Sequence, residues 1–159
     1  MAQQMQGELV AGDWRVAIAV ARFNDLITRH LLWGAEQTWA RLGGEADALS
    51  VSWVPGSLEL PVTAKHLAES GHYAAVVCLG CVIRGETDHY DHVVAQAAKG
   101  IREVSTSTGV PCIFGVLTCD TVEQAINRAG VKQGNQGEKA LMAGVEMANL
   151  LARIDKQSC

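Results

Sequence analysis

The chain has 159 residues, of which 48% are apolar and 19% charged, and its net charge at pH 7 is −4. These values are typical of one globular domain, long enough to bury about two thirds of the surface that its unfolded form exposes. A negative net charge disfavours nucleic acid or an anionic membrane as the main partner, since both are bound by basic surfaces. No apolar run is as long as a membrane span, and residues 1–7 lack the features of a secretory signal, so we expect a cytoplasmic protein.

Four apolar runs predict strands, and the segments between them repeat apolar residues every three or four positions, which predicts helices. The predicted strands are Val16–Ala21, Leu49–Val54, Ala74–Ile83 and Pro111–Leu117. Strands that are apolar throughout and alternate with helices indicate a parallel sheet covered on both faces. We therefore expect an N-terminal arm over 1–12 and a single α/β domain over 13–159, a three-layer αβα sandwich with a four-stranded parallel sheet.

The helical segments are expected to begin at capping residues. Asn24 or Asp25 can cap the first helix, and Asp120, with Glu123 three residues later, resembles the capping box of a short fourth helix. The apolar faces of the five helices are expected within Ile27–Leu42, Leu60–Ala68, Val93–Val104, Asp120–Gly130 and Leu141–Leu151. In the arm, Glu8–Val10 could form a short strand that adds to the sheet of a neighbouring subunit.

Cys78 and Cys81 form a C-x-x-C pair, a spacing found in redox motifs and zinc sites. Both lie in a predicted buried strand, where residues three apart point to opposite faces with Cα atoms roughly 10 Å apart, too far for a disulfide. A second C-x-x-C that could complete a zinc site is absent from the sequence. We therefore expect structural thiols in a reducing compartment.

Three of the four strands run directly into unusual sequence, at Arg22–Asn24, Pro55–Glu59 and Arg84–Asp91. Because ligands gather beyond the carboxyl ends of an open parallel sheet, these segments are expected to share one site. Phe23 could stack on a flat heteroaromatic ring or could be an ordinary core residue. Glu59 could bind a polyol or could only complement the dipole of its helix.

The third segment is the richest in chemistry. Gly85 and Thr87 precede the start of a helix, where free N–H groups and the helix dipole favour an anion, and His89 follows with a pKa range suited to proton transfer. A glycine turn, an N-cap threonine and a surface histidine would give the same pattern. Arg128, near the end of its helix, could reach an anion or only complement the dipole there.

The same segment contains a possible metal cluster, because Asp88, His89, Asp91 and His92 lie within five residues. Carboxylates and imidazoles on one helix face can hold a divalent ion. The sequence offers no second cluster for the remaining ligands, although His66 and His72 are available. Aspartate is also common at helix starts for capping, so we expect no metal.

Six segments together resemble the motifs of the lumazine synthase family, in the same order and spacing from about residue 12 to 152. They are Arg22–Thr28, Val54–Pro61, Gly80–Tyr90, Pro111–Thr118, Glu123–Gly130 and Gly144–Leu150. The resemblance implies a flavodoxin-like fold and a transferase of riboflavin biosynthesis. That enzyme condenses 5-amino-6-(D-ribitylamino)uracil with 3,4-dihydroxy-2-butanone 4-phosphate to 6,7-dimethyl-8-ribityllumazine, releasing phosphate and water. It implies no cofactor, because the substrates supply nucleophile, electrophile and leaving group.

The resemblance also implies roles for individual residues by position. The implied substrate-binding residues are Phe23, Asn24, Ser57, Leu58, Glu59, Cys81, Val82, Ile83 and Phe114. The implied phosphate-binding residues are Gly85, Glu86, Thr87 and Arg128, and the implied catalytic residues are His89 and Arg128. Phe114 and Arg128 correspond to residues that a neighbouring subunit contributes, and Lys132 is a weaker match.

Three positions depart from what the resemblance leads us to expect. Leu58 stands where many relatives have an aromatic residue, and Cys81 where threonine is frequent. The carboxylate of Glu86 would repel a phosphate about 5 Å away by roughly 1–3 kcal/mol per unit charge pair. We therefore expect its side chain to point away while its backbone N–H serves the site.

Members of the resembled family assemble as pentamers or as twelve pentamers in a hollow 60-subunit shell, with active sites between neighbouring subunits. The short turn Gly130–Gly137 favours the shell. Three alternatives to lumazine synthesis remain open at this stage. They are a riboflavin synthase of the lumazine-synthase-like type, a non-catalytic flavin- or lumazine-binding shell protein, and a metal-dependent hydrolase using Asp88–His92.

Overall fold

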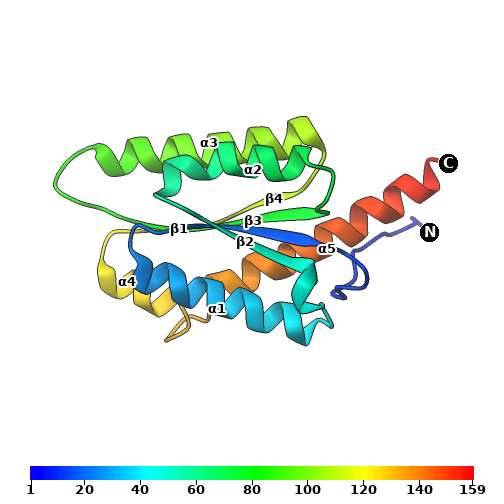
Figure 1. The fold of residues 1–159 in the computed structure, drawn as a ribbon, viewed down its shortest axis with the longest axis horizontal. Coiled ribbons are helices and arrows are strands. Elements are labelled where there is room, and N and C mark those ends of the chain that lie inside the picture. Colours follow the sequence, from blue (N-terminus) through cyan, green and yellow to red (C-terminus); the bar gives the residue numbers. More distant parts are fainter.

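The computed structural model describes residues 1–159, and its centre is a sheet of four parallel strands in the order β2-β1-β3-β4 (Figure 1). The strands are β1 (Val16–Ala21), β2 (Leu49–Val54), β3 (Ala75–Ile83) and β4 (Cys112–Cys119). β1 and β2 have the predicted bounds. β3 and β4 each begin one residue later than predicted, and β4 continues past Leu117 to Cys119.

Helices cover both faces of the sheet, which confirms the predicted three-layer, flavodoxin-like arrangement (Figure 1). The helices on one face are α2 (Leu60–Glu69) and α3 (His89–Thr108), and those on the other are α1 (Asp25–Arg41), α4 (Val122–Arg128) and α5 (Gln136–Gln157). Short 3-10 turns, η1 (Ala46–Ala48) and η2 (Ser57–Glu59), precede β2 and α2. None of the helices is both long and apolar enough to cross a membrane.

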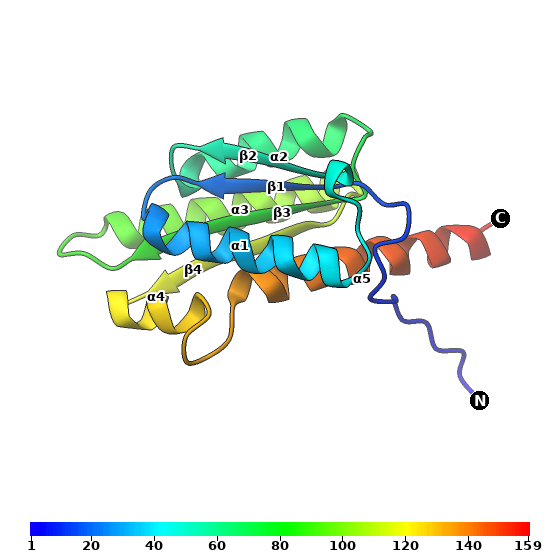
Figure 2. The same cartoon turned by 60° about the horizontal axis from the view of Figure 1, so that its bottom comes forward.

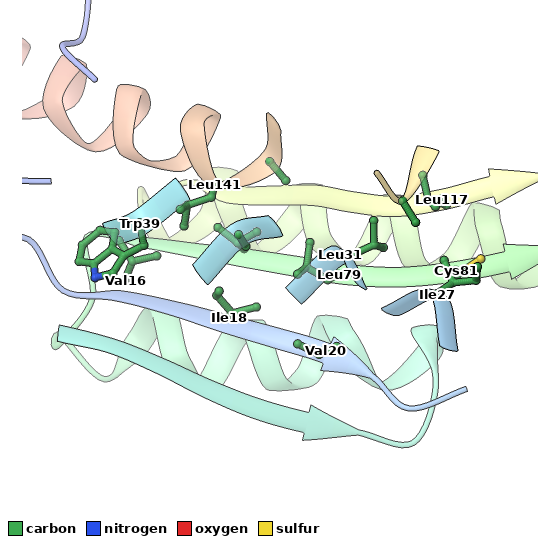
Figure 3. Packing of buried hydrophobic residues seen from close by; sticks show 14 of the residues in the cluster. Val16, Ile18, Val20, Ile27, Leu31, Trp39, Leu79, Cys81, Leu117 and Leu141 are labelled. Atoms are coloured by element: carbon green, nitrogen blue, oxygen red, sulfur yellow. The ribbon is translucent and has the colours of Figure 1, made fainter. Parts of the chain in front are cut away.

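The apolar core consists of two clusters, one on each face of the sheet. Successive side chains of a strand point to opposite faces, so Val16, Ile18 and Val20 pack against α1 and α5 (Figure 3), while the alanines between them face α2 and α3. Every residue of β1 is fully buried because the strand is central and is covered on both sides. This explains why its sequence is apolar throughout rather than alternating.

The two cysteines of the C-x-x-C pair belong to different core clusters. Cys78 lies in the cluster beneath α2 and α3, and Cys81 in the one beneath α1 and α5, so the predicted placement on opposite faces is confirmed. Both are free thiols. Burial raises the pKa of Cys81 to about 12, and burial likewise raises the pKa of Cys78. Both side chains are therefore neutral near pH 7.

Two helix starts differ from the sequence prediction. Asn24 precedes α1, but its side chain makes no capping hydrogen bond. The capping box of α4 lies one residue later than predicted: Thr121 Oγ1 accepts from the Gln124 N–H at 3.1 Å, and Gln124 Oε1 accepts from the Asp120 N–H at 2.8 Å. Thr121 takes the capping position because its backbone is extended there, with φ −133°. Asp120 is left free for another partner.

The N-terminal segment lies along the C-terminal half of α5. Asn149 Nδ2 donates to the carbonyl oxygens of Glu8 and Val10 at 2.7 and 2.9 Å, and Ala11 is fully buried in the core. Glu8–Val10 forms no strand within this chain. Both termini lie at the end of the molecule opposite to α4 (Figure 1).

Candidate active site

The carboxyl ends of the parallel strands meet at one edge of the sheet, where a cavity of about 430 Å³ opens. It lies between the ends of β1, β2 and β3 and the loop that leads into α3, away from both chain termini (Figure 2). Its lining residues are Phe23, Pro55, Gly56, Ser57, Leu58, Glu59, Cys81, Val82, Ile83, Gly85, Thr87, His89, Tyr90 and Val93. The three unusual segments of the sequence therefore share one site, as expected.

Most of the implied substrate-binding, phosphate-binding and catalytic residues line this cavity, but four of them do not: Asn24, Glu86, Phe114 and Arg128. Four further residues line the cavity: Pro55, Gly56 and Tyr90 lie within the predicted segments but were given no role of their own, and Val93 lies outside those segments. Helical spacing was the available signal for one of them, since Val93 follows His89 by four residues and lies on the same side of α3.

Phe23 forms an exposed aromatic wall of the cavity. Its side chain is 70% exposed, which rules out the alternative of a core phenylalanine. Its backbone, in contrast, is fixed, because the N–H groups of Arg22 and Phe23 donate to the carbonyls of Val54 and Pro55 at 2.7 and 3.0 Å. Leu58, across the end of β2, is 47% exposed. The cavity thus presents apolar side chains held by a rigid strand end.

Asn24 holds the end of β1, which carries Phe23, against the end of β3. It has a left-handed backbone with φ 61° and ψ 46°, and its Nδ2 donates to the Cys81 carbonyl at 2.8 Å. Asparagine tolerates the left-handed region better than most residues. The bond joins the exit of β1 to the end of β3, so the side chain fixes two walls of the cavity relative to each other.

Because Gly80 has no side chain, Ser57 can lie directly against β3 at the base of the cavity. A Cβ atom at Gly80 would lie 2.7 Å from Ser57 Oγ, so any other residue there would force the Ser57 side chain or β3 to shift. Ser57 itself is 7% exposed and still lines the cavity. An isolated glycine inside a strand is the sequence signal of such a close approach.

The opposite wall is the exposed loop over residues 84–88, which joins β3 to α3. None of the backbone N–H groups of residues 85–88 donates to another protein group, and the only internal side-chain contact is a long one, from the His89 N–H to Thr87 Oγ1 at 3.4 Å. The loop leads into the first turn of α3, which is the positive end of the helix dipole. Free donors at a helix start favour an anion as ligand.

Arg84, at the start of this loop, has several partners. Its Nε lies 2.9 Å from Asp120 Oδ1, its terminal nitrogen lies 3.5 Å from Asp91 Oδ1, and its guanidinium carbon lies 4.3 Å from the centre of the Tyr90 ring. The side-chain hydrogen bond with Asp120 raises the pKa of Arg84 above its ordinary value. Arg84 does not line the cavity.

Comparison with known proteins identifies the family. The sequence profile of the 6,7-dimethyl-8-ribityllumazine synthase family matches residues 13–152, which is nearly the whole chain. The chain belongs to this family. Among solved structures, it is similar to a GDP-L-fucose synthetase from Naegleria fowleri bound to NADP, with 13% identity and a TM-score of 0.46. A second structure of that synthetase gives 15% identity and a TM-score of 0.44. The chain spans about half the length of each, with 50% of those chains covered.

The family is one of transferases in riboflavin biosynthesis. Of the expected site residues that lie outside the cavity, Phe114 and Arg128 are the two that the sequence resemblance places in a neighbouring subunit. Phe114 lies on β4, one of the two edge strands, and packs half-buried against the α2–α3 cluster. Arg128 ends α4, and its guanidinium donates to the Gln124 carbonyl at 3.3 Å. Lys132 is exposed in the turn that follows.

The acidic and histidine residues at the start of α3 do not form a metal centre. Across the 159 residues, no group of three or more His, Cys, Asp or Glu side chains is arranged to hold a metal ion. Asp91 instead faces Arg84, and His89 lines the cavity.

Proposed function

We propose that this protein condenses 5-amino-6-(D-ribitylamino)uracil with 3,4-dihydroxy-2-butanone 4-phosphate to form 6,7-dimethyl-8-ribityllumazine. The observation that carries the proposal is the composition of the cavity. An exposed, rigidly held Phe23 lies on one side, and a loop of free N–H groups next to His89 lies on the other. A site for these two substrates needs an aromatic surface for the first and an anion site for the second.

The pyrimidine would occupy the side of the cavity formed by β1, β2 and β3. Phe23 would stack on the ring, Ser57–Glu59 would hold the ribityl chain, and Cys81–Ile83 would meet the ring edge. A ribityl hydroxyl can donate to the Glu59 carboxylate, which lines the cavity in this segment. Asn24 would act through its bond to the Cys81 carbonyl, because its amide nitrogen is already engaged.

The phosphate would lie at the loop that precedes α3. The N–H groups of Gly85, Glu86 and Thr87, the Thr87 hydroxyl and the helix dipole would bind it together. Glu86 is exposed and does not line the cavity, so its carboxylate need not approach the anion. Arg128 from a neighbouring subunit would supply the remaining positive charge.

The chemistry needs positioning and proton transfer. The 5-amino group attacks the ketone, and loss of the first water gives a Schiff base between the substrates. Phosphate then leaves by elimination, the ring closes, and a second water is lost. His89, on the cavity wall beside the phosphate loop, would move protons in these steps. The two substrates carry the reacting groups, so the protein contributes mainly orientation.

Family membership implies small-molecule substrates and an oligomeric assembly. An apolar groove of about 320 Å³ lies between α1 and the turn after α4. Three of its lining residues, Leu26, Trp33 and Val131, are 69%, 60% and 69% exposed, and an exposed apolar patch of this kind supports contact with another subunit. We place Phe114 and Arg128 in the active site of the next subunit of a pentamer, and twelve pentamers in a hollow shell. Glu8–Val10 would pair with a neighbour's sheet, and the assembly would be cytoplasmic.

One assay tests the proposal: absorbance of the lumazine product from the two purified substrates, in the presence of a chelator. The expected result is product formation that the chelator does not inhibit. Riboflavin formed from lumazine would indicate a riboflavin synthase, and tight lumazine binding without turnover would indicate a binding protein. Activity lost on chelation would instead support a metal-dependent enzyme. Sedimentation of the same sample separates a pentamer from a 60-subunit shell.

A further inference from the structure

The Arg84 side chain reaches both ends of the 84–88 loop as well as the neighbouring strand. Its backbone N–H continues the sheet by donating to the Cys119 carbonyl at 2.8 Å. Its guanidinium contacts Asp120, the residue after β4, and also Tyr90 and Asp91 in the first turn of α3. One side chain thus connects the ends of β3 and β4 to the start of α3.

Between these two ends, the structure holds the loop only weakly. Residues 85–88 are exposed, and a Cβ atom at Gly85 would meet nothing within 4 Å. Their N–H groups make no bond to the protein, and the Thr87 hydroxyl makes only the long contact with the His89 N–H. Ordering a free loop when a ligand binds costs conformational entropy and so weakens binding. A contact that orders the loop beforehand would remove part of that cost.

Arg84 also controls the charge around the loop. Glu86, Asp88, Asp91 and Asp120 place four carboxylates on or beside it. Arg84 is paired with two of these, Asp91 and Asp120. Removing its charge would leave both carboxylates uncompensated next to the proposed phosphate site, where they would repel an anion.

We propose that Arg84 is a positioning residue for the phosphate of the substrate: it fixes the 84–88 loop so that the N–H groups of residues 85–88 face the cavity before the anion arrives. It acts through the loop and not by contact, since it does not line the cavity. The inference rests on the proposed function, because that function assigns the phosphate to this loop.

The test compares Arg84→Gln with Arg84→Lys and Asp120→Asn. Arg84→Gln is expected to raise the KM for the ketose phosphate and the inhibition constant of inorganic phosphate by about 10-fold, while the KM for the pyrimidine changes less than about twofold. Arg84→Lys keeps the charge but loses the planar fork, so it should recover part of the loss. Asp120→Asn should have a smaller effect, because it breaks one contact and also removes a negative charge. Once Arg84 is replaced, adding Asp120→Asn should have no further harmful effect.

A readout that needs no turnover is hydrogen–deuterium exchange of the amides of residues 84–91. Arg84→Gln should accelerate their exchange in the free protein, and calorimetric titration with inorganic phosphate should show the weaker binding directly. Arg41→Gln is the matched control. Arg41 also joins two elements by an ion pair, with Glu138, but it is the last residue of α1, a helix that begins beside the exit of β1 and runs toward the other end of the sheet (Figure 1).

The outcomes separate the inference from the function on which it rests. Equal effects of Arg84→Gln and Arg41→Gln on phosphate affinity and on loop exchange would overturn the positioning role and leave only general stabilisation. Equal rises in the KM values of both substrates would also overturn it. A wild-type protein that makes no lumazine would contradict the proposed function. Calorimetry and exchange would still show whether Arg84 orders an anion-binding loop.

Discussion

Two strand exits form opposite walls of the cavity, and they are held in different ways. The exit of β1 is short and fully braced, since the Arg22 and Phe23 N–H groups continue the sheet and the Asn24 side chain bonds to the Cys81 carbonyl. The exit of β3 is longer and exposed, and beyond its first residue it depends on the charged contacts of Arg84. The difference suits two kinds of ligand: a flat ring gains from a preformed surface, whereas a phosphate needs free donors.

The largest expected loss of activity is that of a substitution at Arg128, which lies on neither wall of the cavity. Arg128→Ala should lower kcat/KM for the ketose phosphate by more than about 1000-fold, because it would remove the positive side chain that we propose for the leaving phosphate. The measurement is the rate of lumazine formation at varied ketose phosphate.

A mixing experiment shows whether Arg128 acts across a subunit boundary. When Arg128→Ala and His89→Ala chains are refolded together in equal amounts, about a quarter of the shared sites should contain both native residues. Activity well above that of either variant alone is expected. Activity equal to the mean of the two separate variants would place Arg128 in the site of its own chain.

His89→Ala should lower kcat by about 10–1000-fold, because the variant loses the side chain that we propose transfers protons. Phosphate affinity should stay nearly unchanged, because the donors that we propose for the phosphate belong to the loop residues before His89 and not to its side chain. Steady-state kinetics with phosphate as competitor give both quantities. Unchanged turnover would exclude the proton-transfer role.

Substitutions at Asn24 test how the exit of β1 is held in place. Asn24→Ala should lower the free energy of unfolding by about 2 kcal/mol, through a lost hydrogen bond and a left-handed backbone that alanine disfavours. Asn24→Gly accepts that backbone, so it should lose only about 1 kcal/mol. Thermal unfolding of both variants separates the two contributions. Equal losses of unfolding free energy in the two variants would mean that alanine adopts the left-handed backbone at no cost in free energy.

The smallest expected effect concerns the thiol of Cys81, the residue whose carbonyl accepts the Asn24 hydrogen bond. Cys81 is 2% exposed, and burial raises its pKa to about 12, so it stays protonated and unreactive at pH 8. Iodoacetamide at that pH should modify the exposed Cys159 and leave Cys81 and the activity intact, as mass spectrometry would show. Rapid inactivation with modification of Cys81 would reveal opening of this wall.

Much of the fold followed from local sequence. Strand bounds in β1 and β2 were predictable because Arg15 and Arg22 directly flank the apolar run of β1, and Pro55–Gly56 ends β2. The helix starts were less predictable, since Asp120 and Thr121 are both good caps and only the path of the chain selects one. Asn24 illustrates the same limit: its residue type suits a cap, but the nearby Cys81 carbonyl takes its side chain instead.

The sequence by itself determined the parallel sheet, the family and the segments that build the cavity, because these depend on periodicity and on motifs contiguous along the chain. Only the tertiary structure decided which side chains meet across distant segments. The ion pair between Arg84 and Asp120 spans 36 residues, and the contact between Gly80 and Ser57 joins a strand to a preceding turn. Such contacts depend on strand order and register, which bring residues from separate segments within bonding distance. A local pattern such as a glycine inside a strand can indicate a close approach, but it does not name the partner.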